Sequence, residues 1–249
     1  MKLDNKVALV TGASRGLGLA IARELLAQGA SVACMARASE ELSRAVTQLA
    51  DSGARVMAAP ADVTHEAEVA AVIGNVVAAW KRLDILVLNA GTWQGSPLAE
   101  TTETQWDFLL DLNLKGAFLP LKHSIPHLTQ QRGSTVVGIS SIGGLAGQAG
   151  SAAYSASKWG LRGLLESAAL ELKKDRVRVS IVSPHNINSA GRAIDPASPD
   201  RTRSLETQEI AELVAFICAA PPHAAIGNVS IWPLDAGISV SMAKRTEGV

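Results

Sequence analysis

Residues 7–18 read VALVTGASRGLG, and they are the most informative part of the sequence about its architecture. Four apolar residues lead into three glycines spaced Gly-x-x-x-Gly-x-Gly, and a helical pattern follows near Leu17–Gln28. Glycines in such a turn let backbone N–H groups approach a pyrophosphate, and the positive end of the next helix favours the anion. The preceding strand and the following helix distinguish this stretch from an ordinary glycine-rich turn. It therefore predicts a dinucleotide-binding unit.

Short β-branched runs alternate with longer helical patterns along the rest of the chain. The strand candidates are Val7–Thr11, Ser31–Met35, Arg55–Ala59, Ile85–Leu88, Thr135–Ser140, Val177–Val182 and Asn228–Trp232. The further helical patterns lie near Glu40–Asp51, Glu66–Trp80, Glu103–Ile125, Tyr154–Lys174 and Glu206–Ala219. Ile85–Leu88 is apolar without alternation, which indicates a parallel strand buried on both faces. The pattern predicts a doubly wound α/β fold, formed by residues 1–249 as one domain.

Composition excludes several classes of protein. The hydrophobic fraction of 47% is high enough for a buried core, and the formal net charge of +0 argues against nucleic acid as a partner. The two cysteines, Cys34 and Cys218, are too few for a disulfide scaffold. No apolar run is long enough to span a bilayer, and the first residues do not resemble a signal peptide. We expect a soluble cytoplasmic protein with no membrane partner. His123 and His127 lack a third ligand nearby, so we expect no metal site.

The tip of the second strand candidate bears on which dinucleotide is bound. In NAD-binding folds a carboxylate about 20 residues after the glycines binds the ribose 2′-hydroxyl. Here the strand ends in Cys34-Met35-Ala36-Arg37, without a carboxylate. Arg37 and Arg15 offer guanidinium groups that suit a 2′-phosphate. We therefore favour NADP(H) over NAD(H), while Glu40 or Glu41 could still reach the ribose.

The chain has one tyrosine, Tyr154, and Lys158 follows it by one helical turn. Residues four apart share a helix face, so the two side chains point the same way. A phenol titrates near pH ~10, and an adjacent ammonium lowers that pKa toward the range needed for proton transfer. Ser140 and Ser141 close the fifth strand candidate, where ligands bind in an open α/β sheet. A core tyrosine and a helix-start serine are the alternatives, but their joint occurrence favours a catalytic site.

Taken together, these segments resemble the short-chain dehydrogenase/reductase family. The matching segments span nearly the whole chain: residues 11–18, Asn89-Ala90-Gly91, Asn113, Ser141 and Tyr154-x-x-x-Lys158. The resemblance implies a Rossmann-type fold with a seven-stranded sheet and nicotinamide-dependent interconversion of a carbonyl and an alcohol. Within the family the chain looks like the 3-oxoacyl-carrier-protein reductases. An acyl thioester and a small ketone or aldehyde are both open as substrates.

The resemblance also implies a role for each matching residue. Tyr154 is the proton donor or acceptor, and Lys158 lowers its pKa and hydrogen-bonds the nicotinamide ribose. Ser141 orients the substrate oxygen, and Asn113 holds a water in a proton relay to Lys158. Besides Tyr154 and Lys158, the expected cofactor-binding residues are Gly12, Ser14, Arg15, Gly16, Leu17, Gly18, Arg37, Asp62, Val63, Asn89, Ala90, Gly91, Pro184, Ile187 and Ser189.

The sequence departs from the family's pattern after the sixth strand candidate. The family usually has Pro-Gly, then a β-branched residue, then Thr, whereas this chain reads Pro184-His185-Asn186-Ile187-Asn188-Ser189. The bulk of His185 either contacts the substrate or only shifts the loop. Residues 190–205 are short for the family's substrate lid. The residues expected to line the substrate pocket are Trp93, Gly143, Leu145, Gln148 and His185.

Two further questions concern partners and catalysis. In the family, the helices that correspond to Glu103–Ile125 and Tyr154–Lys174 build a dimer interface, so we expect a homodimer or homotetramer. Trp106 and Trp159 are the candidate contacts, with core packing as their alternative role. The alternative function is a non-catalytic NADP(H)-binding redox sensor or regulatory protein of the same fold. Such proteins tend to lose the tyrosine or the lysine, and this chain has both.

Overall fold

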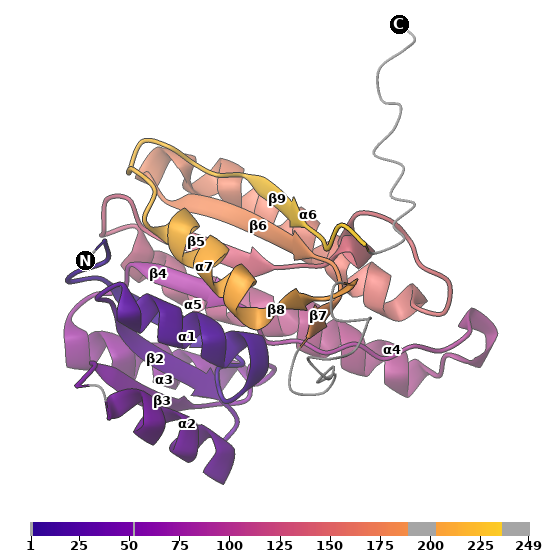
Figure 1. Ribbon diagram of the computed structural model, residues 1–249, viewed down its shortest axis with the longest axis horizontal. Coiled ribbons are helices and arrows are strands. Elements are labelled where there is room, and N and C mark those ends of the chain that lie inside the picture. The colour runs from indigo at the N-terminus through magenta and orange to yellow at the C-terminus, as the bar shows by residue number, and fades with distance from the viewer. Residues whose placement is uncertain (1, 52, 189–202, 236–249) are drawn as a thin grey trace, which may run out of the picture.

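A seven-stranded sheet forms the centre of the computed structural model, which describes residues 2–51, 53–188 and 203–235 (Figure 1). All of its strand pairs are parallel, and the strand order is β3-β2-β1-β4-β5-β6-β9. The strands are β1 (Val7–Thr11), β2 (Ser31–Ala36), β3 (Val56–Pro60), β4 (Ile85–Leu88), β5 (Thr135–Ile139), β6 (Arg178–Pro184) and β9 (Asn228–Ile231). The predicted doubly wound α/β fold with a seven-stranded parallel sheet is confirmed.

Helices cover both faces of this sheet (Figure 1). The helices are α1 (Gly16–Ala27), α2 (Glu40–Ala50), α3 (Glu66–Trp80), α4 (Glu103–Leu110), α5 (Gly116–Leu128), α6 (Ala152–Leu172) and α7 (Thr207–Cys218). Helices α1, α2 and α7 bury their apolar residues on one face, while α3, α5 and α6 pack on the other. The sheet is therefore the middle of three layers, with a core on each side.

The continuous apolar strands follow from this three-layer arrangement. Successive side chains of a strand point to opposite faces. In β1, Ala8 and Val10 belong to the core under α1 and α7, whereas Val7 and Leu9 belong to the core under α3, α5 and α6. Because both faces are covered, neither set of positions needs to be polar.

One predicted helix differs in the structure. The pattern over Glu103–Ile125 predicts a single helix, but α4 and α5 are separated by a π-helical turn, η2 (Asp111–Lys115). A short parallel pair was not expected either, formed by β7 (Ile187–Asn188) and β8 (Leu205–Glu206). Most of the predicted loop at residues 190–205 lies outside the described residues. The described residues also include three 3-10 helices: η1 (Leu98–Glu100), η3 (Ile142–Gly144) and η4 (Lys173–Asp175).

Arg178 connects the start of β6 to the end of α7. Its guanidinium group donates hydrogen bonds to the carbonyl oxygens of Ile217, Cys218 and Ala220 at distances of 2.9–3.3 Å. A helix leaves its last carbonyl groups without intrahelical partners, so these added donors suit the end of α7, where the Ile217 carbonyl also accepts the Ala220 N–H at 3.3 Å. A cation at this end also suits the helix dipole. The buried arginine therefore fixes α7 against the sheet.

Asp84 lies just before β4 and connects the amino ends of the central strands. Its side chain is 1% exposed and accepts hydrogen bonds from the backbone N–H of Val7 and from the Lys6 ammonium, both at 3.0 Å. The Arg82 guanidinium donates two more, at 2.7 Å and 2.6 Å. Burial alone would raise the pKa of Asp84, but these hydrogen bonds outweigh it and hold the pKa below its ordinary value.

We expect Asp84→Asn to lower the free energy of unfolding by about 1–3 kcal/mol at pH 7, because the variant removes the buried carboxylate that pairs with the half-buried Lys6 and Arg82. A carboxyl with a lowered folded-state pKa stabilises the fold above about pH 4 and loses this effect as the pH falls through the folded pKa. Asp84→Asn should therefore also flatten the loss of stability below pH 4. Urea unfolding between pH 3 and pH 7 measures both effects. Equal pH dependence in the two proteins would contradict this role of Asp84.

Candidate active site

The predicted site residues gather at the carboxyl ends of the central strands. The chain leaves β1 toward β2 on one side and resumes at β4 on the other, so the strand order reverses between β1 and β4. A crevice forms at such a reversal in open α/β sheets, and ligands bind there. The ends of β1, β4 and β5 place Thr11, Asn89 and Ser141 at neighbouring points of this edge.

The glycine-rich loop leads from β1 directly into α1. Gly12 has a φ of +67°, a conformation that L side chains rarely adopt, and a Cβ on it would lie 3.0 Å from the Cα of Ala90. Gly18 packs so closely on the carbonyl oxygen of Gly12 that a side chain there would collide with it. The first turn of α1 carries no acidic residue, and Arg15 does not cap it with its side chain. The N–H groups of the first turn, such as those of Gly16 and Leu17, have no partner within the helix, which suits a phosphate.

Thr11 and Asn89 lock this loop onto the end of β4. The Thr11 hydroxyl accepts hydrogen bonds from the backbone N–H groups of Asn89 and Ala90, both at 2.9 Å, and donates one to the Val87 carbonyl at 3.3 Å. The Asn89 amide nitrogen in turn donates to the Thr11 carbonyl at 2.9 Å. Asn89, Ala90 and Gly91 therefore lie directly beside the glycine loop.

The residues predicted to contact the adenosine half lie at the ends of β2 and β3. Arg37 follows β2 and is exposed, and its charge acts on the carboxyl of Asp62. Burial acts to raise the pKa of Asp62, but hydrogen bonds from the Thr64 hydroxyl and backbone N–H hold it below its ordinary value. Val63 is buried and packs against Gly116 at the start of α5. Arg37 and Asp62 are thus at the surface, whereas Val63 belongs mostly to the core.

Ser141, Gly143 and Tyr154 are brought together by the turn after β5. Ser141 precedes η3, and its hydroxyl accepts a hydrogen bond from the Gly143 N–H at 3.1 Å. A Cβ on Gly143 would lie 3.0 Å from Cε1 of Tyr154 and 3.6 Å from the Ser141 hydroxyl oxygen. Because Gly143 has no side chain, the ring of Tyr154 and the hydroxyl of Ser141 can flank the same small space.

Lys158 reaches the same region from the next turn of α6. Its ammonium nitrogen lies 5.9 Å from the centroid of the Tyr154 ring, so the two side chains share one helix face. The side chain is 5% exposed, and its ammonium donates to the Ile139 carbonyl at the end of β5, at 3.0 Å. Burial lowers the pKa of Lys158 to about 8. The amine therefore stays mostly protonated at pH 7 despite its burial.

Asn113 sits inside the π-helical turn η2 and is fully buried. Its side-chain oxygen accepts from the Thr92 N–H at 2.8 Å, and its nitrogen donates to the Thr92 carbonyl and the Ser157 hydroxyl, both at 3.0 Å. The Ser157 hydroxyl donates to the Tyr154 carbonyl at 2.7 Å. Asn113 therefore joins the segment after β4 to α6. Interruptions of this kind in an α-helix occur frequently at functional sites.

The residues predicted to line the substrate pocket differ in exposure. Trp93 is exposed, and its indole N–H donates to the Ser151 hydroxyl at 3.2 Å. Gln148 is exposed, while Leu145 and His185 are half-buried.

His185 continues the backbone ladder beyond β6, since its N–H donates to the Ile231 carbonyl at 2.9 Å. Its Nδ1 atom is buried and has no hydrogen-bond partner among the described residues, and burial lowers the pKa of the ring. Pro184 is buried and Ile187 half-buried, whereas Ser189 lies outside the described residues.

Two contributors to this geometry received no role from the sequence. The sequence indicates Thr11 only as part of the glycine motif, and Ser157 only as a residue between Tyr154 and Lys158. Ser157 lies three residues after Tyr154, so helical spacing could have placed it on the same face. Glu41, which was only an alternative ribose contact, accepts a hydrogen bond from Ser14.

Two other expectations concern surfaces and ligands. Trp106 and Trp159 are both more than one-third exposed, so they are not core residues, and assembly through their helices stays a prediction. In the described part of the chain, no group of three or more His, Cys, Asp or Glu side chains is placed to hold a metal ion. Over the same residues, no helix combines the length and apolarity needed to cross a bilayer.

Known proteins resemble this chain over most of its length. Residues 6–197 match the family described as short chain dehydrogenase. An uncharacterized oxidoreductase of Staphylococcus aureus (strain MRSA252) is 32% identical over 232 residues, which are 93% of this chain and 99% of that protein. A metagenomic short-chain oxidoreductase in complex with NADP is 37% identical, with a TM-score of 0.82 over 94% of this chain and 99% of that one.

A short chain dehydrogenase from Burkholderia cenocepacia J2315, also in complex with NADP, is 30% identical. Its TM-score is 0.85, over 94% of this chain and 98% of that chain. Both structures agree with the present fold across nearly the whole chain.

The burial of Lys158 should cost stability. Its pKa is about 8 in the fold and about 10.4 in an unfolded chain, so the protonated side chain destabilises the fold below pH 8. We expect Lys158→Met to raise the free energy of unfolding by about 1–3 kcal/mol at pH 7 and to lose this advantage as the pH rises toward 10. Chemical denaturation at both pH values measures it, with the exposed Lys122→Met as control. A variant less stable than the wild type at pH 7 would refute the argument.

Proposed function

Because the chain belongs to the short-chain dehydrogenase/reductase family, we propose that this oxidoreductase uses NADP(H) to interconvert a carbonyl and an alcohol. The observation that carries the proposal is the shared position of Tyr154 and Lys158 on one face of α6, beside Ser141 and at the edge that also holds the glycine loop. This placement suits proton transfer to an oxygen that lies next to a bound dinucleotide.

The donors at this edge fit a nicotinamide dinucleotide. The first turn of α1 offers N–H groups without an acidic residue or a side-chain cap, which suits a pyrophosphate. Arg15 and Arg37 add positive charge on the side of the adenosine ribose. The bound nicotinamide would supply or accept a hydride, whereas the protein residues position the reactants and handle the proton. NADP is bound in two solved relatives, which supports the same class of cofactor here.

Tyr154 and Ser141 would act on the substrate oxygen. A carbonyl gains negative charge on its oxygen as it is reduced, so preorganised donors there lower the barrier. The Ser141 hydroxyl donates a hydrogen bond to this oxygen, and the Tyr154 hydroxyl donates both a hydrogen bond and the proton that completes the alcohol. In the oxidative direction Tyr154 takes the proton back.

Lys158 and Asn113 would support the tyrosine. The Lys158 ammonium places a positive charge close to the ring, in a setting with little water to screen it, and so stabilises the phenolate that is left after proton transfer. Asn113 holds the segment after β4 against α6 through Thr92 and Ser157. The proposed water relay from Asn113 to Lys158 would start from this fixed position.

We assign the substrate to a class of carbonyl compounds. The exposed indole of Trp93 offers a flat apolar wall, and the half-buried imidazole of His185 lies just after β6. These groups suit a small ketone or aldehyde, and equally the β-carbonyl of an acyl thioester. Turnover can be measured as the loss of NADPH absorbance with a panel that contains ketones, aldehydes and 3-oxoacyl thioesters. The compounds that are reduced show which of the two substrate classes the protein accepts.

We expect Tyr154→Phe to lower kcat/KM for any carbonyl that the wild type reduces by on the order of 10²–10⁴, because the variant keeps the ring but loses the proton donor. Binding of NADP(H), measured by fluorescence titration, should change little. Turnover equal to that of the wild type would remove Tyr154 from the mechanism. If the wild type binds NADP(H) but reduces no carbonyl in the panel, the non-catalytic sensor becomes the better proposal.

We expect Arg37→Asp to weaken binding of NADPH at least about tenfold while changing the affinity for NADH much less, because the variant places a carboxylate where a guanidinium would meet the 2′-phosphate. Isothermal titration with each dinucleotide measures the two affinities. Arg44→Asp on α2 carries the same charge change and is the matched control. Equal losses for NADPH and NADH would contradict a phosphate contact at Arg37.

A further inference from the structure

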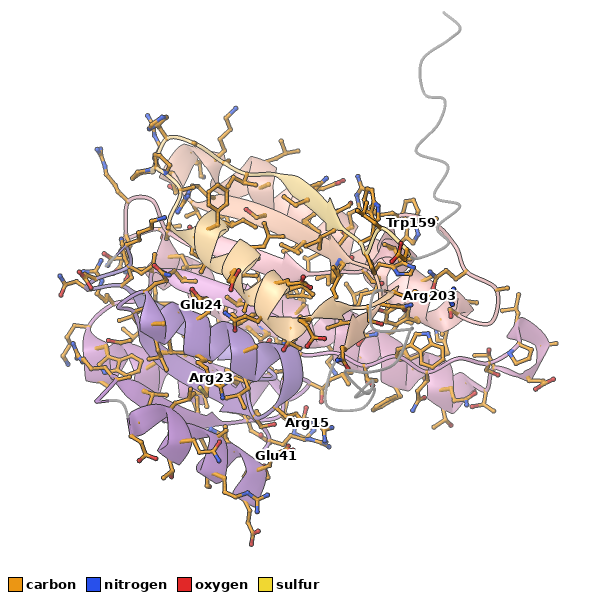
Figure 2. The ribbon with its side chains drawn as sticks, viewed as in Figure 1. Arg15, Arg23, Glu24, Glu41, Trp159 and Arg203 are labelled. Atoms are coloured by element: carbon orange, nitrogen blue, oxygen red, sulfur yellow. The ribbon has the colours of Figure 1, made fainter. Side chains whose placement is uncertain are left out.

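A carboxylate already occupies two of the donors that a phosphate would use beside the glycine loop. Glu41 accepts a hydrogen bond from the Ser14 hydroxyl at 3.1 Å, and its other carboxylate oxygen lies 3.7 Å from a guanidinium nitrogen of Arg15. Figure 2 shows Arg15 and Glu41 side by side at the same end of the molecule. Ser14 and Arg15 both belong to the loop between β1 and α1.

The start of α2 determines where this carboxylate lies. Ser39 caps the helix by accepting a hydrogen bond from the Leu42 N–H at 3.2 Å, which fixes the first turn. Within that turn Glu41 faces the glycine loop, and its side chain is 43% exposed. The neighbouring Glu40 points elsewhere, because its side chain is 93% exposed and lies 3.8 Å from Arg44. Two adjacent carboxylates therefore have different surroundings.

The two forms of the dinucleotide would meet Glu41 differently. A 2′-phosphate competes with the carboxylate for the Ser14 hydroxyl and the Arg15 guanidinium, and the two anions repel each other at close range. A 2′-hydroxyl can instead donate a hydrogen bond to the carboxylate. Glu41 thus opposes the phosphorylated form and accepts the unphosphorylated one, while Arg37 favours the phosphorylated form.

We propose that Glu41 is a specificity-determining residue that lowers the preference of this protein for NADP(H) over NAD(H). The inference rests on the proposed function, because it requires a dinucleotide at the glycine loop. Glu41 acts by holding Ser14 and Arg15, and by repelling the 2′-phosphate. Removal of its charge should therefore increase the discrimination between the two forms without any change in the catalytic residues.

Binding of two adenosine fragments to the full chain tests this inference. Adenosine 2′,5′-bisphosphate and adenosine 5′-monophosphate differ only in the 2′-phosphate and contain no nicotinamide. We expect Glu41→Gln to tighten binding of the bisphosphate about three- to tenfold relative to the monophosphate at low ionic strength. The gain should shrink in 0.5 M salt, where charges at the surface are screened. Isothermal titration gives both affinities.

Glu40→Gln is the matched control, since it makes the same charge change one residue away and without contact to the glycine loop. We expect it to leave the ratio of the two affinities unchanged. An unchanged ratio in Glu41→Gln, or an equal gain in Glu40→Gln, overturns the inference. Failure of all three proteins to bind either fragment at millimolar concentration overturns it as well, by removing the adenosine site. The turnover of Tyr154→Phe tests the proposed catalytic function and does not depend on the fragment affinities. The proposed function and the role of Glu41 can therefore fail independently.

Discussion

The hydroxyl of Thr11 connects the two halves of the sheet at the point on which the site depends. It accepts hydrogen bonds from the backbone N–H groups of Asn89 and Ala90, which follow β4, and donates one to the carbonyl of Val87. These hydrogen bonds hold the end of β1 against the end of β4 and so fix the path of the glycine loop. Gly12 can lie close to Ala90 in this arrangement because it has no Cβ. The crevice at the strand reversal is thus held by backbone groups on both of its sides.

On the side of the crevice that we propose to be catalytic, the burial of a charged group lowers stability. Lys158 is buried with a backbone carbonyl as its acceptor, and no carboxylate neutralises it among the described residues. An ammonium in such a place is costly, but its field is also less screened than it would be in water. Asn113 contributes in the same region through hydrogen bonds of both of its polar side-chain atoms, so the segment beside the lysine is held in place.

Most of the fold and part of the site could be predicted from local pattern. Apolar runs such as Ile85–Leu88 require burial on both faces, and this requirement alone indicates a parallel sheet between helices. Helical spacing was enough to place Tyr154 and Lys158 on one face. The contact of Ser14 with Glu41 was not predictable, because 27 residues separate them and only the packing of α2 beside the loop brings them together. The π-helical turn around Asn113 was also missed, since periodicity does not reveal one extra residue in a turn.

The extra residue in the π turn changes the rotation of α4 about the helix axis relative to α5. A π turn holds one residue more than an α turn, so α4 is rotated by about 100° relative to where an uninterrupted helix would place it. Deleting one residue within Asp111–Lys115 would restore the regular ladder, but it would also turn Trp106 and the rest of α4 around the axis of α5. The outward face of α4 and the inward direction of Asn113 are therefore set by the same local irregularity. Sequence changes that alter the length of this segment would affect both of them together.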